Sequence, residues 1–263
     1  MINLIGISGK SKSGKDEVGK IIRYLTYCSE TNQSMSYTDY SKLMSLNDCE
    51  IDDYITHTWN IKKFAGKVKE IISLITGISI EDLEREEIKT EYLSNDWNWY
   101  IERDGKIVYE MPTDVKYQEL HKYTVRQMLQ IVGTDLFRNQ FHPNTWINSL
   151  FTDFRPIETT SQLIKNYDIS SRWIITDLRF ENESKAILDR NGILIRVNRQ
   201  LHNRYNLDAD INVQHPLYNK LHHESEISLD NYTNFNYTIK NDGIIDDLIE
   251  ATRQILINEN IIR

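Results

Sequence analysis

The chain has 263 residues, 40% of them hydrophobic, which is enough for one large domain or two modest ones. It carries 39 Asp and Glu against 31 Lys and Arg, a formal net charge of −8, so a nucleic-acid polymer is disfavoured as a partner. No charged leader opens the chain and no apolar run approaches the roughly 20 residues of a membrane span, so we expect a soluble, cytoplasmic protein without a membrane partner. Cys28 and Cys49 lack a metal-binding pattern and indicate ordinary reduced cysteines.

Strand and helix patterns alternate in the first part of the chain. Residues 2–7 are apolar and run into Gly9, which predicts a short strand followed by a turn. Apolar residues then recur at helical spacing from Asp16 onward, and again over residues 64–75. We expect a helix in each of these two segments.

A hairpin pattern interrupts the helical middle of the chain. Residues 99–101 and 107–109 flank Asp104-Gly105, a dipeptide typical of tight β-turns. We interpret this β-hairpin as part of an insertion at about 76–122. It is a candidate contact in a homodimer or a candidate part of a substrate pocket.

The second half of the chain again alternates helix and strand. A helix carrying Val125, Met128 and Val132 is expected to break near Gly133, and His142-Pro143 opens a short helix. Buried strands are predicted over 173–177, 193–197 and 237–239, and a closing helix follows from residue 244. Strands joined by helices predict an α/β fold with a mainly parallel sheet covered on both faces. Gly and Pro are scarce, which favours a single domain over 1–263, with an irregular, lid-like region at about 198–226.

The most specific motif is the segment from Gly9 to Asp16, which fits G-x-x-x-x-G-K between a strand and a helix. Such a loop wraps phosphate with its backbone N–H groups, and the helix dipole adds to the attraction. Lys15 is expected to reach the terminal phosphates of a nucleoside triphosphate. Asp16 stands where Ser or Thr is usual, and it either contacts Mg²⁺, directly or through water, or caps the helix. The alternative reading of the whole segment is a surface turn without a ligand.

Phosphoryl transfer needs further charged groups, and several residues are candidates. Asp177 ends a buried strand, where α/β sheets present their ligands, and Arg179 follows it; the two alternatively satisfy each other. Arg126 lies on the helix face opposite the apolar residues and Arg138 follows one level on, although exposed arginines are usually simply solvated. The remaining candidates are a ligand-approaching helix break at Gly133-Thr134, a base-stacking or core Trp146, and lid residues Arg199, His202 and Arg204.

Several blocks, in order, resemble the phage-type deoxynucleoside monophosphate kinases. They are residues 9–16, 64–69, 125–136 with Trp146, 176–179 and 237–243. The resemblance implies a P-loop fold with a helical acceptor-binding region, and transfer of the ATP γ-phosphate to a deoxynucleoside 5′-monophosphate (dNMP) with Mg²⁺. It implies catalytic roles for Lys15, Arg126, Asp177 and Arg179. The metal is expected at Asp16 and Asp177.

The substrate contacts that we predict from the residues and the resemblance together fall into two sets. ATP is expected at Ser11, Lys12, Ser13, Gly14, Lys15, Asp16 and Glu17. The dNMP is expected at Lys10, Lys69, Arg126, Gly133, Thr134, Arg138, Trp146, Asp177 and Arg179. If the source is a phage, the enzyme works in the cytoplasm of the host cell.

Two alternative functions remain open. The loop from Gly9 to Asp16 and the block 223–226 are also similar to animal phosphomevalonate kinase, which has no need for a base-stacking Trp146. A nucleotide-dependent switch without transfer chemistry would have no use for a second cluster of arginines. Neither the accepted bases nor the discrimination against ribose can be predicted from these patterns.

Overall fold

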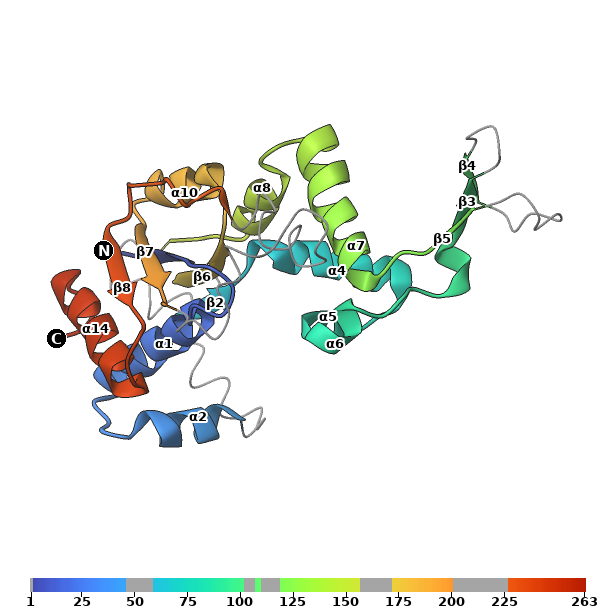
Figure 1. Ribbon diagram of the computed structural model, residues 1–263. Coiled ribbons are helices and arrows are strands. Elements are labelled where there is room, and N and C mark those ends of the chain that lie inside the picture. The colour runs from blue at the N-terminus through green and yellow to red at the C-terminus, as the bar shows by residue number, and fades with distance from the viewer. Residues whose placement is uncertain (1, 46–58, 102–106, 110–118, 157–171, 201–226) are drawn as a thin grey trace. The chain divides into compact units, whose positions relative to one another are not determined.

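The computed structural model describes residues 2–45, 59–101, 107–109, 119–156, 172–200 and 227–263 (Figure 1). The chain divides into two compact units. The first comprises Met1–Phe64 and Leu150–Arg263, and the second comprises Ala65–Ser149. The predicted insertion at 76–122 falls within the second unit, and the predicted lid-like region lies, from residue 201 onward, outside the described residues.

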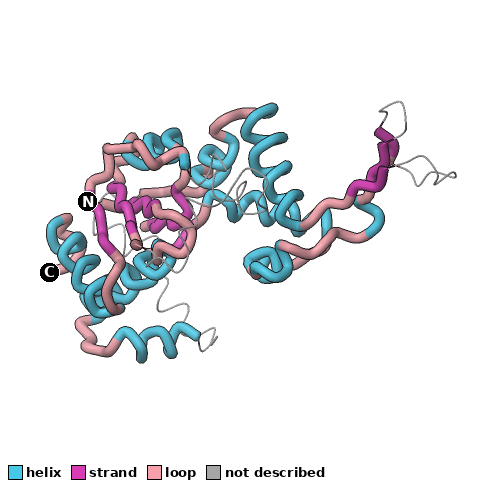
Figure 2. The backbone as a smooth tube through the Cα atoms, in the orientation of Figure 1, coloured by secondary structure: helices cyan, strands magenta, loops and turns pink. Residues whose placement is uncertain are grey.

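Five parallel strands form the sheet of the first unit, in the order β2, β6, β1, β7, β8. Figure 2 shows strands in magenta and helices in cyan. They are β1 (Leu4–Ser8), β2 (Asn60–Lys62), β6 (Trp173–Leu178), β7 (Ile193–Asn198) and β8 (Tyr237–Lys240). The central strand β1 is buried along its whole length, which accounts for its unbroken apolar character. The predicted α/β fold with a mainly parallel sheet is confirmed, and β2 is a strand that the sequence did not predict.

Helices cover both faces of this sheet. The helices of the first unit are α1 (Lys15–Thr31), α2 (Tyr37–Ser45), α10 (Glu181–Leu188) and α14 (Ile245–Asn258). Figure 1 shows α1 and α14 on one face and α10 on the other. Side chains alternate along β1, so Ile5 and Ile7 join the core with α1 and α14, whereas Gly6 lies against Ile187 of α10. The arrangement is compatible with a three-layer α/β fold. None of the described helices is long and apolar enough to cross a membrane.

The second unit combines helices with a small antiparallel sheet. Its helices are α4 (Phe64–Thr76), which begins in the first unit, α5 (Ile80–Glu84), α6 (Glu86–Lys89), η1 (Asn95–Trp97), α7 (Val125–Gln130), η3 (Ile131–Phe141) and α8 (Thr145–Phe151), which ends in the first unit. Its strands are β3 (Trp99–Ile101), β4 (Ile107–Val108) and β5 (Glu119–His121). The antiparallel pairing of β3 with β4 confirms the predicted hairpin strands, while its Asp104-Gly105 turn lies outside the described residues. β5 adds a third strand on the other side of β3.

The predicted helix break near Gly133 is wrong. α7 starts from a capping box at Thr124, and the helical path continues through Gly133 as the π-helix η3. The indole Nε1 of Trp146 donates a hydrogen bond of 2.6 Å to the Gly133 carbonyl, and the Trp146 side chain is buried. A helical glycine costs about 1 kcal/mol relative to alanine. Here the hydrogen bond from the buried Trp146, 13 residues further along the chain, offsets the cost of a glycine within a helix.

This contact predicts a specific loss of stability in the variant Trp146→Phe. The Gly133 carbonyl would lose its donor, so the free energy of unfolding should fall by about 1–3 kcal/mol in a urea titration followed by far-UV circular dichroism. Trp97→Phe is the matched control, because Trp97 is half-buried in the same unit and its indole makes no hydrogen bond to the described residues. Equal losses in the two variants would contradict this account of Gly133.

Candidate functional site

The loop from Gly9 to Asp16 joins the carboxyl end of β1 to the first turn of α1. In open parallel sheets this edge is where ligands bind. Two glycines are required by its path. Gly14 has φ 97°, in the left-handed region, and a Cβ on Gly9 would lie 2.7 Å from the Val197 carbonyl oxygen. The loop therefore passes too close to β7 for any residue with a side chain to replace Gly9 without a shift of the backbone.

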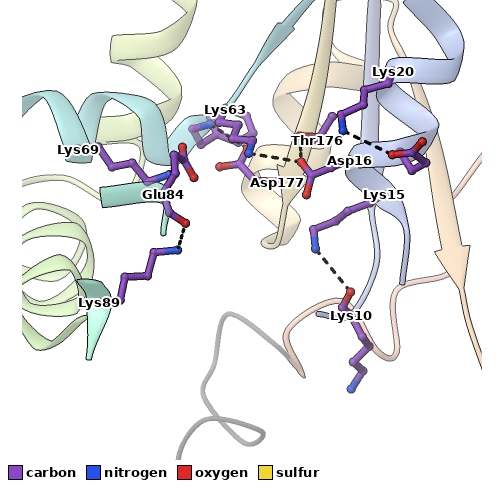
Figure 3. Close-up of polar contacts among 12 residues, drawn as sticks. Lys10, Lys15, Asp16, Lys20, Lys63, Lys69, Glu84, Lys89, Thr176 and Asp177 are labelled. Carbon is purple, nitrogen blue, oxygen red and sulfur yellow. Dashed lines mark hydrogen bonds and ion pairs between the residues drawn. The ribbon is translucent and has the colours of Figure 1, made fainter. Parts of the chain in front are cut away.

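Hydrogen bonds hold the loop in a tight turn. The Ser13 amide donates to the Lys10 carbonyl at 3.1 Å, and the Lys15 ammonium lies 3.5 Å from the same oxygen (Figure 3). From outside the loop, the side-chain amide of Asn241, just after β8, donates to the Ser13 carbonyl at 2.8 Å. The Ser13 hydroxyl is buried and has no hydrogen-bond partner among the described residues.

Asp16 points to β6 and not to the backbone of its own helix. Its Oδ1 accepts a hydrogen bond of 2.7 Å from the Thr176 hydroxyl and lies 3.4 Å from the Lys63 ammonium (Figure 3). Partial burial raises the pKa of the Asp16 carboxyl, but the Thr176 hydrogen bond and the charges of Lys63 and Lys15 outweigh it and hold the pKa below its ordinary value. Asp16 is therefore a carboxylate that is anchored to β6 through Oδ1 while its side chain stays 55% exposed.

The other predicted residues of the first unit have structural contacts. Asp177, next to Thr176, accepts a hydrogen bond of 2.9 Å from the Phe64 amide at the start of α4. The Arg179 amide donates to Glu183 at 2.9 Å in the turn that opens α10. Glu17 accepts a hydrogen bond of 2.6 Å from the Tyr37 hydroxyl. Ser11 and Lys12 are exposed at the tip of the loop, where Lys12 has φ 63°.

In the second unit, Lys69 and Arg126 are both paired with carboxylates of the α5–α6 segment. Lys69 is buried on α4 and forms an ion pair with Glu84. Arg126 donates from Nη2 to Glu86 at 2.7 Å. Partial burial raises the pKa of Glu86, but hydrogen bonds from Lys89 and Arg126 overcome this and lower it to about 2. Lys69 and Arg126, both predicted to bind phosphate, are thus neutralised by carboxylates of one short segment.

The remaining predicted residues lie either in the second unit or outside the described residues. Gly133, Thr134 and Arg138 lie on η3, and Trp146 is in the core. His202 and Arg204 of the predicted lid lie outside the described residues. No group of three or more His, Cys, Asp or Glu side chains that could hold a metal occurs in the part of the chain that the structure describes.

The contacts of the loop with Thr176, Lys63 and Asn241 were not predicted from the sequence. Each comes from a segment far away along the chain, so no local spacing could have revealed it. In comparisons with known proteins, no family model matches this chain and no curated protein does either.

The bond between Thr176 and Asp16 predicts a pH-dependent effect of Thr176→Val. A folded-state pKa that is depressed contributes stability above the ordinary value of 3.8, and this contribution is lost as the pH falls through the folded pKa. The variant should lose about 1 kcal/mol of unfolding free energy at pH 7, and the deficit should shrink below pH 3.8. Urea titrations at pH 7 and pH 3.5 or so measure both values.

Thr252→Val is the control for this experiment. Thr252 is equally buried but donates to the neutral Leu248 carbonyl at 2.7 Å, so its deficit should not depend on pH. A Thr176→Val deficit that is the same at both pH values would contradict the charged hydrogen bond.

Proposed function

We propose that this protein is an ATP-dependent deoxynucleoside monophosphate kinase with a P-loop fold. It transfers the ATP γ-phosphate to a deoxynucleoside 5′-monophosphate and so supplies DNA precursors, in the cytoplasm of a host cell if the source is a phage. The observation that carries the proposal is the loop from Gly9 to Asp16, because its motif, its two required glycines and its place before α1 occur together.

The contacts of the loop support phosphate binding. The first N–H groups of α1 lack partners within the helix and form the positive end of its dipole. Lys15 is the first residue of α1, and its side chain bends back to the Lys10 carbonyl (Figure 3). Its ammonium therefore lies near the turn, and the proposal assigns it to the terminal phosphates. The buried Ser13 hydroxyl is one more donor at the same turn.

The residues at the loop also fit a magnesium ion. Mg²⁺ prefers hard oxygen ligands and is commonly held by one or two carboxylates together with substrate phosphates. Asp16 offers an ionised carboxylate whose side chain is 55% exposed, and it would hold the ion directly or through water. Asp177 is the second carboxylate of the proposal, although its Oδ1 already accepts the Phe64 amide. When bound, Mg²⁺ supplies positive charge against the phosphate oxygens.

Transfer would occur in line, without a covalent intermediate on the protein. A monophosphate oxygen is already anionic, so the chain has to position it and to stabilise charge, and needs no strong base. Lys15 and the loop amides would stabilise charge on the donor. For the acceptor phosphate, the proposal assigns Arg126 and Arg179, since a guanidinium can hold a phosphate with two hydrogen bonds.

The proposal predicts acceptor-dependent release of ADP from Mg-ATP. A coupled assay against dTMP, dGMP, dCMP, dAMP, the ribonucleotides and phosphomevalonate should give turnover with at least one deoxynucleotide, and it names the accepted bases. The reaction without an acceptor is the control for ATP hydrolysis.

Two outcomes would contradict the proposal. Turnover with phosphomevalonate alone would favour the alternative, a small-molecule kinase similar to phosphomevalonate kinase. Tight binding of ATP without turnover for any acceptor would favour a nucleotide-dependent switch and would leave the arginine assignments without support.

A further inference from the structure

A chain of charged contacts lies beside the loop, and the roles assigned so far do not use all of it. Lys10 extends its ammonium away from Lys15, although its carbonyl faces Lys15 (Figure 3). That ammonium lies 2.6 Å from Oδ2 of Asp230. The other oxygen of Asp230, Oδ1, accepts from Nη2 of Arg196 at 3.2 Å. One carboxylate is thus shared by two cations, one from the loop and one from β7.

Arg196 is fixed at the start of the loop. It pairs in register with Ser8, the last residue of β1, and its Nη1 donates to the Ser8 hydroxyl at 2.8 Å. Its guanidinium also lies 5.7 Å from the centre of the Phe235 ring. The Arg196 side chain is only 13% exposed, whereas that of Lys10 is 52% exposed. A cation this buried needs a compensating negative charge, and Asp230 provides it.

Asp230 itself is held less firmly than Arg196. It belongs to a turn before β8, and its side chain is 35% exposed. Ion pairs that reach solvent in this way contribute little to stability, so Asp230 can leave Lys10 at low cost. Two cations and one carboxylate also leave one unit of positive charge in the cluster, which attracts a further anion.

We propose that Lys10 and Arg196 form an anion subsite in which the Asp230 carboxylate occupies the place of a phosphate group. An arriving phosphate monoester displaces Asp230 from Lys10 and takes both cations as hydrogen-bond donors. Asp230 is therefore an internal competitor that lowers the affinity for this phosphate. In naming the acceptor dNMP as the natural ligand, the inference rests on the proposed function; the binding of phosphate itself does not.

The test is a titration of the full chain with inorganic phosphate by isothermal calorimetry. Asp230→Asn keeps the shape of the side chain but removes its charge, and should bind phosphate on the order of fivefold more tightly than the natural chain. The gain should be absent when Lys10→Ala is added, and it should shrink when Arg196→Lys is added. Asp153→Asn, which makes the same charge change at an exposed residue of the same unit, should leave the affinity unchanged.

Several outcomes would overturn the subsite. Unchanged or weaker binding of phosphate by Asp230→Asn would make Asp230 a structural partner of Lys10 and not a competitor. A gain that persists with Lys10→Ala, or is undiminished by Arg196→Lys, would place the anion elsewhere. An equal gain in Asp153→Asn would reduce the effect to net charge.

A second titration separates this inference from the proposed function. With a dNMP that the kinase assay shows to be accepted as the ligand, Asp230→Asn should again bind more tightly, and the Michaelis constant for that dNMP should fall. A gain for inorganic phosphate without any kinase turnover would leave the subsite standing and reject the proposed function. Kinase turnover without tighter binding of either ligand by Asp230→Asn would support the proposed function and reject the subsite.

Discussion

The path of the chain between β1 and α1 depends on one close approach, that of Gly9 to the Val197 carbonyl in the neighbouring strand. The loop leaves the strand there, turns through Gly14 in the left-handed region and enters α1 at Lys15. Because Gly9 has no side chain, the loop can lie directly against the carboxyl edge of the sheet, where a Cβ would not fit. Asn241 holds it there from the residue that follows β8, and Thr176 holds Asp16 from β6. Three parallel strands therefore determine where the loop amides and Lys15 lie.

Cations in both units of this acidic chain are paired with nearby carboxylates. Lys63 pairs with Asp16 and Lys10 with Asp230 in the first unit, and Lys69 pairs with Glu84 in the second. Such pairing allows a chain of net charge −8 to keep local positive groups partly buried. Under the proposed function, an anionic substrate would compete with these carboxylates, so its affinity would depend on which of them can move away.

Much of the first unit could be predicted from the sequence, because its signals are local. The strands β1, β6 and β7 are mainly apolar runs, β8 alternates apolar and polar residues, and the helices α1 and α14 repeat apolar residues at helical spacing. β2 was missed because it is a three-residue edge strand with one apolar residue, Ile61. The helix break near Gly133 was predicted wrongly because the hydrogen bond from Trp146 to the Gly133 carbonyl has no signal in the local sequence. For the site, the loop motif was visible, whereas its anchors on other strands have no signature in the spacing of residues.

The most direct test of the account is the binding of Mg-ATP by calorimetry to the natural chain and to Lys15→Ala. Lys42→Ala on α2 is the control, since Lys42 is exposed and pairs only with Asp39 among the described residues. The natural chain and the control should bind equally, and Lys15→Ala should bind about 10-fold to 100-fold more weakly, as expected for loss of a charged hydrogen bond. Equal binding by all three, or no binding by the natural chain, would contradict the assignment of the loop as a phosphate site.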